Sequence, residues 1–533
     1  MKTILTLAIT VALVAAPTAF SGSAAWKRTP ADGDWNNAAN WLGDGPPNGP
    51  SDIATFNFSR LTNLSLSAPT TLDSLVVGHQ AGNAGDWTTT VPSGMQLSFV
   101  GAGISNLYSF QYFVSDATGG PGGGIIFSNS ASSGSFTTFT NRGGTVSGES
   151  GGFVEFLDSS SEPLGYGSTI INEGGTVAGA GGGFTELRDT ADLGSTEFSN
   201  LAGVAGASGG STSFYDSATG GIDMFAGGGT EAGAGPGSIH FFNISSIPAF
   251  LTADGGTNGA AGGLIEIHDD CPGGFRLFSL FGNGVVDLSD HNPAIPVTVG
   301  AIEGEGSILL GGTNLVIGPP DIPWHYFSGV ISDGGKGGSL TLVSGDQILA
   351  LVISGASTYT GGTTVDGGDL YVLENPNGSG TGRGPVTVPS GLLGGTGVIG
   401  GAVTVGDGNG DPGYLEPDSD VGHISVLIVQ KRVTFKSDGI YSFQGRSTTG
   451  QAAKLTAKGV SIESGATFNA FDRSPQTLRP GTRFVAINNT SPSSIAGTFG
   501  NLPDGGTIQI GNNTFQANYE GGDGNDLTLT VTQ

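Results

Sequence analysis

A short phrase that recurs six times between Gly122 and Asp269 constrains the fold more than any other feature of the chain. Each copy alternates apolar with polar residues and ends in Asp or Asn. Successive ends lie about 26 to 31 residues apart, a spacing in the range of solenoid repeats. The copies are GGIIFSN, FVEFLD, FTELRD, STSFYD, SIHFFN and LIEIHD, ending at Asn129, Asp158, Asp189, Asp216, Asn243 and Asp269.

The alternation within each copy predicts which side chains face the core, because successive residues of a strand point to opposite faces. Positions two and four before the final Asp or Asn are predicted to point inward. The inward set is Ile125, Val154, Thr185, Thr212, Ile239 and Ile265, with Phe127, Phe156, Leu187, Phe214, Phe241 and Ile267. The outward set is Glu155, Glu186, Ser213, His240 and Glu266, with Ser128, Arg188, Tyr215 and His268.

One such strand buries only half of its surface, so it needs a neighbouring copy. Stacked copies pair their backbones at about 4.8 Å and place Phe on Phe. The terminal Asp or Asn, followed by Ser, Ala or Gly, is typical of a turn, since Asx side chains bond to nearby backbone. We therefore predict an all-β protein, a parallel β-helix or β-solenoid with an N-terminal cap and a C-terminal β cap. The handedness of the coils stays open.

Composition agrees with a solenoid and excludes some partners. Gly accounts for 98 of 533 residues and only 12% are charged, yet Val, Ile, Phe and Leu recur in short runs that a disordered linker lacks. The net charge is −27, from 45 acidic and 18 basic residues. This charge argues against nucleic acid and anionic membranes as partners. It fits solubility, cation uptake or contact with neutral glycans.

Residues 1–25 have the features of a signal peptide. Lys2 precedes an apolar core, and Ser23 to Ala25 offer small residues for cleavage before Trp26. We expect a secreted, extracellular or cell-surface protein. The mature chain contains no apolar run long enough to predict a membrane span. The single Cys271 is predicted to be an inert, structural thiol.

The remaining chain divides into four predicted regions. Residues 26–60, with Trp26, Trp35 and Trp41, form a cap that covers the open end of the stack, or alternatively a sugar-stacking platform. We predict a β-helix with repeats of about 27 residues in 61–335, a more regular repeat solenoid in 336–430, and a C-terminal β-domain or cap in 431–533.

Several motifs resemble secreted bacterial proteins with autotransporter-associated β-strand repeats. The most specific is ISGASTYTGGTTVDGG from Ile353 to Gly368, followed by LLGGTGVIGGAVTV, which ends at Val405. The resemblance covers most of the chain and implies a β-helical passenger with an adhesive, surface-layer or matrix role. The chain stops at Gln533 without the outer-membrane barrel strands of true autotransporters. We therefore expect release or non-covalent retention at the surface.

The outward carboxylates are one candidate for chemistry. Neighbouring coils bring Glu155, Glu186 and Glu266 with His240 onto one face, where paired carboxylates can act as acid and base. Any solvent-facing column has the same appearance, and a β-helix does not by itself imply catalysis. The sequence therefore predicts no catalytic residues.

A candidate calcium loop follows the pattern D-x-N-x-D. Its ligands are predicted to be Asp407, Asn409, Asp411 and Asp418. Pro412 occupies the loop position that requires Gly, so a solvated turn is the alternative. No other cofactor is expected.

The segment Trp324–His325–Tyr326 is the candidate glycan contact, because aromatic planes stack on sugars. The alternative is a plug of core side chains beneath a loop. We predict an exported, non-catalytic β-solenoid that is adhesin-like or a structural component of the surface or matrix. The alternatives are a polysaccharide-active lyase or hydrolase, a glycan-binding module and a spacer rod. Expected partners are extracellular polysaccharide or cell-surface components, and the chain is predicted to be a monomer.

Overall fold

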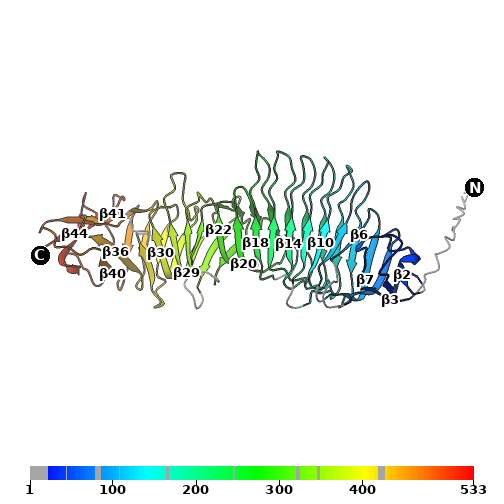
Figure 1. The fold of residues 1–533 in the computed structure, drawn as a ribbon. Coiled ribbons are helices and arrows are strands. Elements are labelled where there is room, and N and C mark those ends of the chain that lie inside the picture. Colours follow the sequence, from blue (N-terminus) through cyan, green and yellow to red (C-terminus); the bar gives the residue numbers. More distant parts are fainter. Residues whose placement is uncertain are drawn as a thin grey trace, which may run out of the picture.

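The computed structural model is an elongated stack of β-coils, with the N-terminal and C-terminal strands at opposite ends (Figure 1). It describes residues 22–532 except 44, 79–85, 107–108, 164–166, 244–246, 320–323, 345–348 and 418–425. Within this part of the chain the only helix is one 3-10 turn, Ala38–Asn40. The predicted fold class, a β-solenoid, is confirmed, and the predicted signal peptide lies almost wholly outside the described residues.

The first sheet contains 14 strands and runs along one side of the stack. From β3 onward its members pair in parallel with the strand one coil away. Its strands are β1 Ala24–Trp26, β2 Trp41–Leu42, β3 Gly49–Phe56, β5 Thr70–Val77, β7 Gln96–Ser105, β9 Gly124–Phe127, β11 Phe153–Phe156, β13 Phe184–Leu187, β15 Ser211–Phe214, β17 Ser238–Phe241, β19 Leu264–Ile267, β21 Val285–Asp287, β23 Ser307–Leu309 and β26 Val330–Ser332.

The second sheet faces the first across the core and continues farther toward the C-terminus. Its early members are β4 Asn63–Ser65, β6 Trp87–Val91, β8 Gln111–Ser115, β10 Thr137–Asn141, β12 Thr169–Asn172, β14 Glu197–Asn200, β16 Asp223–Ala226, β18 Phe250–Ala253, β20 Gly273–Leu280, β22 Val297–Gly304, β24 Asn314–Ile317 and β25 Trp324–Phe327. Its later members are β27 Ser339–Val343, β28 Ala350–Ile353, β29 Gly362–Val372, β30 Val386–Gly395, β32 Val403–Val405, β33 Gly413–Glu416, β35 Val433–Phe435, β36 Ile440–Arg446, β37 Gln451–Ala452, β39 Val460–Ile462 and β40 Thr467–Asp472.

A third sheet of seven strands closes the C-terminal end. It joins parallel coils to an antiparallel terminus, in which β44 pairs with both β41 and β43. Its strands are β31 Val398–Ile399, β34 Val426–Val429, β38 Lys454–Ala457, β41 Arg483–Asn489, β42 Thr507–Ile510, β43 Asn513–Gly521 and β44 Asp526–Val531. Parallel stacking continues to β40, so the predicted boundary at residue 430 falls inside the stacked coils.

The core follows the alternation in the repeated phrase. All twelve side chains of the predicted inward set are buried. Phe99, Phe127 and Phe156 stack on successive coils with ring centroids 5.0 and 4.9 Å apart, close to the strand spacing of about 4.8 Å. Identical aromatic residues at one register position therefore form a continuous column inside the first sheet.

Asparagine side chains of the second sheet form a hydrogen-bonded ladder that runs from coil to coil inside the core. The amide of Asn141 donates to Oδ1 of Asn172 at 2.7 Å, and that of Asn172 donates to Oδ1 of Asn200 at 2.8 Å. The hydroxyl groups of Thr185 and Thr212 also donate to this ladder, at 3.0 and 2.9 Å. Burying these amides is tolerable because each coil supplies a hydrogen-bond partner to its neighbour, and in this ladder Oδ1 of Asn141 has no partner among the described residues.

The Asp or Asn that ends each phrase occupies a corner with left-handed backbone. The six residues have φ between 52° and 63°, a region that Asn and Asp adopt more readily than most residues. The backbone N–H of Asn129 donates to the carboxylate of Asp158 at 2.8 Å, and that of Asp158 donates to Asp189 at 3.1 Å. The predicted turn chemistry is therefore confirmed, and it also links one coil to the next.

Long loops on one side extend this stacking away from the core (Figure 1). They connect strands of the second sheet to the first, as between β10 and β11. The N–H of Gly148 donates to the carbonyl of Gly179 at 2.8 Å, and Gly179 donates to Gly206 at 2.7 Å. The loops thus form an ordered ridge along the middle of the rod.

The N-terminal cap is confirmed by the burial of its tryptophans. Trp26, Trp35 and Trp41 are each at most 2% exposed and pack edge to face, with centroids 5.1 Å apart. Phe56 joins them and stacks on Trp87 of the next coil at 4.4 Å. Their faces lie inside the core, which excludes the alternative of a sugar-stacking platform. Among the described residues, no helix has the length and apolar character needed to cross a membrane.

Candidate functional site

The outer face of the first sheet gathers the charged side chains that the repeat pattern predicted. Its strands keep one register, so Glu155 pairs with Glu186, Glu186 with Ser213, and His240 with Glu266. Ser213 is buried, whereas the other four are partly exposed. The sheet therefore holds an acid-rich column on its solvent side, with adjacent members one coil apart.

Two carboxylates at one end of this column differ in their surroundings. Arg188 donates to Oε2 of Glu186 through Nη2 at 2.6 Å and through Nε at 3.1 Å. The pKa of Glu155 is raised, first by burial and then by the negative charge of Glu186. One carboxylate is thus paired with a cation, while the pKa of its neighbour is raised.

A second group lies farther along the same face. Glu266 Oε2 is 2.7 Å from Nδ1 of His240 on the preceding coil and 3.6 Å from Nε2 of His268. The two imidazoles lower the pKa of Glu266. Glu266, in turn, raises the pKa of His268, with smaller contributions from Asp290 and Asp269. Among the described residues these three side chains are the group of His, Cys, Asp and Glu that can converge on one metal ion.

An aromatic ladder runs beside the acidic column. Tyr215, Phe242 and His268 stack with centroids 4.8 and 4.6 Å apart and nearly parallel rings. The guanidinium of Arg188 lies 4.1 Å from the centroid of Tyr215 and covers the end of the ladder. These ring faces are therefore occupied by one another. The sequence places Arg188, Tyr215 and His268 on the outer face, but it does not reveal that His268 also approaches Glu266.

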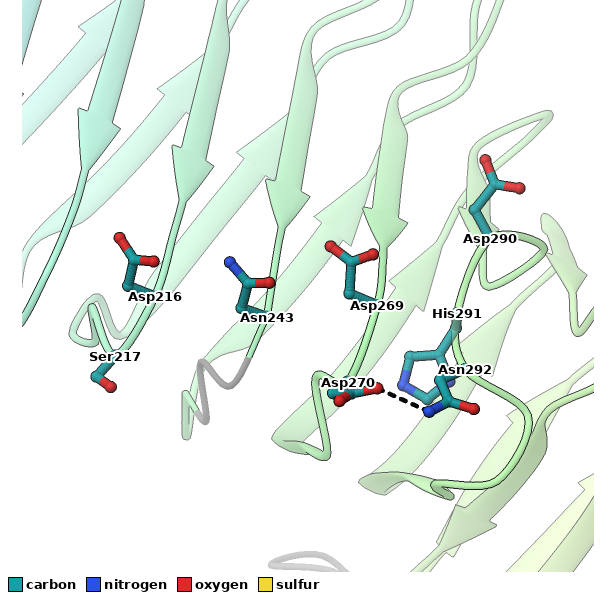
Figure 2. Close-up of a pocket in the computed structure, with 8 residues that line it drawn as sticks. All are labelled: Asp216, Ser217, Asn243, Asp269, Asp270, Asp290, His291 and Asn292. Carbon is teal, nitrogen blue, oxygen red and sulfur yellow. Dashed lines mark hydrogen bonds between the residues drawn. The ribbon is translucent and has the colours of Figure 1, made fainter.

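The Asp and Asn corners border an acidic trough of about 770 Å³ next to His268. Asp216, Asn243 and Asp269 follow one another on successive strands, and Asn292 donates to Asp270 at 2.8 Å (Figure 2). Its lining is Asp216, Ser217, Asn243, Asp269, Asp270, Asp290, His291 and Asn292. Such a concentration of carboxylates attracts cations to this side of the rod.

The predicted glycan segment forms strand β25, and alternation separates its members. Trp324 and Tyr326 point outward and are 44% and 60% exposed, whereas His325 points inward and is 4% exposed. Trp324 stacks on Tyr371 with centroids 6.0 Å apart. Tyr371 belongs to a small apolar cluster outside the main core, together with Ala350 and Val352. The surface part of the predicted set is therefore Trp324 and Tyr326.

The predicted calcium loop is organised around a carboxylate that sequence reasoning did not include. The amides of Gly408 and Gly410 donate to Asp438 at 2.9 and 3.0 Å. Partial burial opposes the ionisation of Asp438, but these hydrogen bonds outweigh it and lower the pKa. Asp407 accepts hydrogen bonds from Asn409 at 2.7 Å. Asp411 is exposed, Asp418 lies outside the described residues, and calcium binding stays a prediction.

Comparisons with known proteins name no family. No protein-family model matches the chain, and no curated protein matches it. Among solved structures the chain is similar to the crystal structure of the Haemophilus influenzae Hap adhesin, with a TM-score of 0.27 and 10% sequence identity. The match covers 90% of this chain but only 64% of the adhesin chain. A likeness this distant carries no functional argument, and the resemblance to autotransporter-associated repeat proteins stays a prediction.

Proposed function

We propose that the protein is an exported β-solenoid rod that acts at the cell surface or in the medium as an adhesin-like or matrix component without catalysis. The observation that carries this proposal is the outward pair Trp324 and Tyr326 on β25. Two exposed aromatic side chains, two residues apart on one strand, present flat apolar surface with polar tips. This combination suits the alternating C–H and hydroxyl groups of a pyranose ring.

The position of the pair on a strand supports a binding role. β25 is tied to β28 through four register pairs, from Trp324 with Ala350 to Phe327 with Ile353. A side chain on such a rigid element loses little conformational freedom when a ligand binds. A single pair of aromatic residues gives modest affinity, and many rods on one surface increase it by avidity. Extracellular polysaccharide is therefore the proposed partner.

The carboxylates Glu155 and Glu186 favour a polysaccharide-active enzyme as the second candidate. They are register partners on adjacent coils, and paired carboxyl groups about 5 to 5.5 Å apart serve retaining glycoside hydrolysis. The raised pKa of Glu155 suits a general acid, while Glu186, which forms an ion pair with Arg188 at 2.6 Å, would serve as the nucleophile. This candidate predicts cleavage of the chain to which the protein binds.

One experiment separates these candidates. The purified protein is incubated with a panel of neutral and acidic polysaccharides, and retention is measured together with new reducing or unsaturated ends. Retention without cleavage, lost in a Trp324→Ala/Tyr326→Ala variant, supports the proposal. Phe471→Ala is the matched control, since Phe471 is an exposed aromatic residue on β40 with 57% exposure.

Two other results contradict the proposal. Cleavage that disappears in Glu155→Gln and Glu186→Gln variants establishes the enzyme instead. If the protein neither binds nor cleaves any polysaccharide or cell surface tested, the rod is a spacer without a ligand of its own.

A further inference from the structure

The side chains of His240, Glu266 and His268 converge because of the parallel register. Glu266 on β19 is the direct register partner of His240 on β17. His268 follows Glu266 by two residues and therefore lies on the same face. One ligand atom from each of the three lies within 4.8 Å of the other two. The coil spacing thus brings a carboxylate between two imidazoles, one across the sheet and one along the strand.

The distances around Glu266 are close to those between the ligand atoms of one metal site. A tetrahedral site with bonds of about 2.0 to 2.2 Å places its ligand atoms roughly 3.4 Å apart. Glu266 Oε2 lies 2.7 Å from Nδ1 of His240 and 3.6 Å from Nε2 of His268, which brackets this value. Shifts of less than about 1 Å at the ends of three side chains suffice to admit an ion.

The environment of one ring nitrogen of His268 supports a metal site independently of these distances. Its Nε2 atom is shielded from solvent and has no hydrogen-bond partner among the described residues. The 3.6 Å separation from Glu266 is too long for a hydrogen bond. A buried polar atom without a partner costs free energy, and a bound water or ion is one way to satisfy it. This nitrogen faces the carboxylate that the other imidazole already contacts.

The surroundings hold both rings in place. Nε2 of His240 lies 2.8 Å from the hydroxyl of Ser238, which fixes the ring so that Nδ1 faces Glu266. Phe242 stacks on His268 at 4.6 Å and lies 6.2 Å from His240, forming an apolar wall. Metal-binding histidines commonly have such a second contact on the other ring nitrogen.

We propose that His240, Glu266 and His268 bind one transition-metal ion of the Zn²⁺ class. Two imidazoles and one carboxylate suit Zn²⁺ and similar ions, whereas Ca²⁺ and Mg²⁺ prefer oxygen ligands throughout. Each of the three side chains keeps between 18% and 28% of its surface exposed, so the fourth coordination position is open to water or to an outside donor.

The charges around the cluster favour a cation. Asp269 and Asp290 lie close enough to His268 to raise its pKa, and Asp287 on β21 is the register partner of Glu266. This site is independent of glycan binding and holds whether or not the proposed function is correct.

The test uses the untagged protein, freed of metal with a chelator and titrated with Zn²⁺. We expect one ion per chain by calorimetry and by metal analysis after dialysis, a higher Tm with Zn²⁺, and no such change with Ca²⁺. Glu266→Gln and His268→Gln are expected to weaken binding by at least about 100-fold. Ser238→Ala, which removes the contact to Nε2 of His240, is expected to weaken it by about 10-fold.

Glu155→Gln is the matched control, because Glu155 occupies the same outward column three coils away. It is expected to leave Zn²⁺ affinity unchanged. The proposal is overturned if the parent binds no Zn²⁺, or if Glu266→Gln and His268→Gln bind it as tightly as the parent. The second result assigns the ion to another place, such as His79 or His423, which lie outside the described residues. Circular dichroism checks that each variant is folded.

Discussion

Two outer faces of this rod carry aromatic side chains, and these side chains differ in how far they are exposed to solvent. On β15 to β19 the rings of Tyr215, Phe242 and His268 cover one another at 4.8 and 4.6 Å. On β25 the ring of Tyr326 is 60% exposed. The first set is a structural ladder, whereas the second is available to a partner.

Register explains the difference. The strands from β9 to β19 repeat one register, so each outward residue has a neighbour on both sides. β25 pairs with the preceding β22 only through Phe327 and Gly304. Trp324 and Tyr326 therefore lack a register partner on that side. Exposed binding surface arises here where the regular repeat is interrupted.

The largest expected effect comes from breaking the regular stack itself. A Cβ on Gly183 would lie 2.1 Å from the carbonyl oxygen of Asn141, and neither backbone can move freely. We expect Gly183→Ala to lower the free energy of unfolding by about 3 kcal/mol, the upper range of overpacking. Urea unfolding measures this loss. Gly445→Ala is the control, since its nearest neighbour would be 3.8 Å away and the change should be within about 0.5 kcal/mol.

Substitution of aromatic residues on the two faces should have different effects, one on ligand binding and the other on the stability of the fold. Trp324→Ala/Tyr326→Ala is expected to reduce polysaccharide retention at least about 10-fold, which corresponds to a loss of about 1.4 kcal/mol of binding free energy. Phe242→Ala is expected to leave retention unchanged. It should instead cost about 1 to 3 kcal/mol of stability, because two stacked neighbours lose their contact. Equal losses of retention in both variants would contradict the distinction.

The neighbouring charges of Glu266 and His268 predict that the stability of the fold depends on pH. The lowered pKa of Glu266 stabilises the fold above about pH 4.5, the ordinary titration range of Glu, and this contribution is lost as the pH falls through the lowered pKa. The raised pKa of His268 stabilises it fully below about pH 6.5, and this contribution is lost as the pH rises through the raised pKa.

Together these shifts place the strongest contribution of the pair between about pH 4.5 and 6.5. In metal-free protein we expect stability to fall by about 1 kcal/mol from pH 6 to pH 9, after allowance for partial exposure. Thermal unfolding of the parent and of Glu266→Gln measures it. The variant should lose most of this dependence, and a parallel decline in both proteins would assign it to other groups.

The last prediction concerns chemical reactivity and not stability or binding, at Cys271, which lies at the corner after β19. The thiol is buried, and burial raises its pKa to about 11. A thiol reagent at pH 8 should therefore react at least about 100-fold more slowly with the native protein than with the unfolded chain. Rapid modification of the native protein would show that this corner opens readily.

The sequence predicts the regular part of the molecule well, for a physical reason. Alternation and spacing determine which residues face the core, and all twelve predicted inward residues between Ile125 and Ile267 are buried. The same alternation predicts the outward positions of Glu155, Glu186, His240 and Glu266. A periodic chain therefore reveals its fold and its columns of side chains directly.

Periodicity alone does not predict which side chains from different columns contact one another. His268 belongs to a different outward column from His240, and only side-chain geometry brings both to Glu266. Trp324 stacks on Tyr371, a contact between residues far apart in sequence. His325 lies within the predicted glycan segment, yet the strand turns it inward. These results depend on the path of each coil and not on its periodicity.

The asparagine ladder has a consequence for how such a rod changes length. Asn141, Asn172 and Asn200 satisfy each other only when every coil occupies the same phase, so a partial coil leaves a buried amide without its partner. Duplication or loss of a whole coil preserves the pattern and alters the rod by about 4.8 Å. The length of the rod can therefore change in steps of one whole coil. Evolution can make such a change without altering the packing of the core.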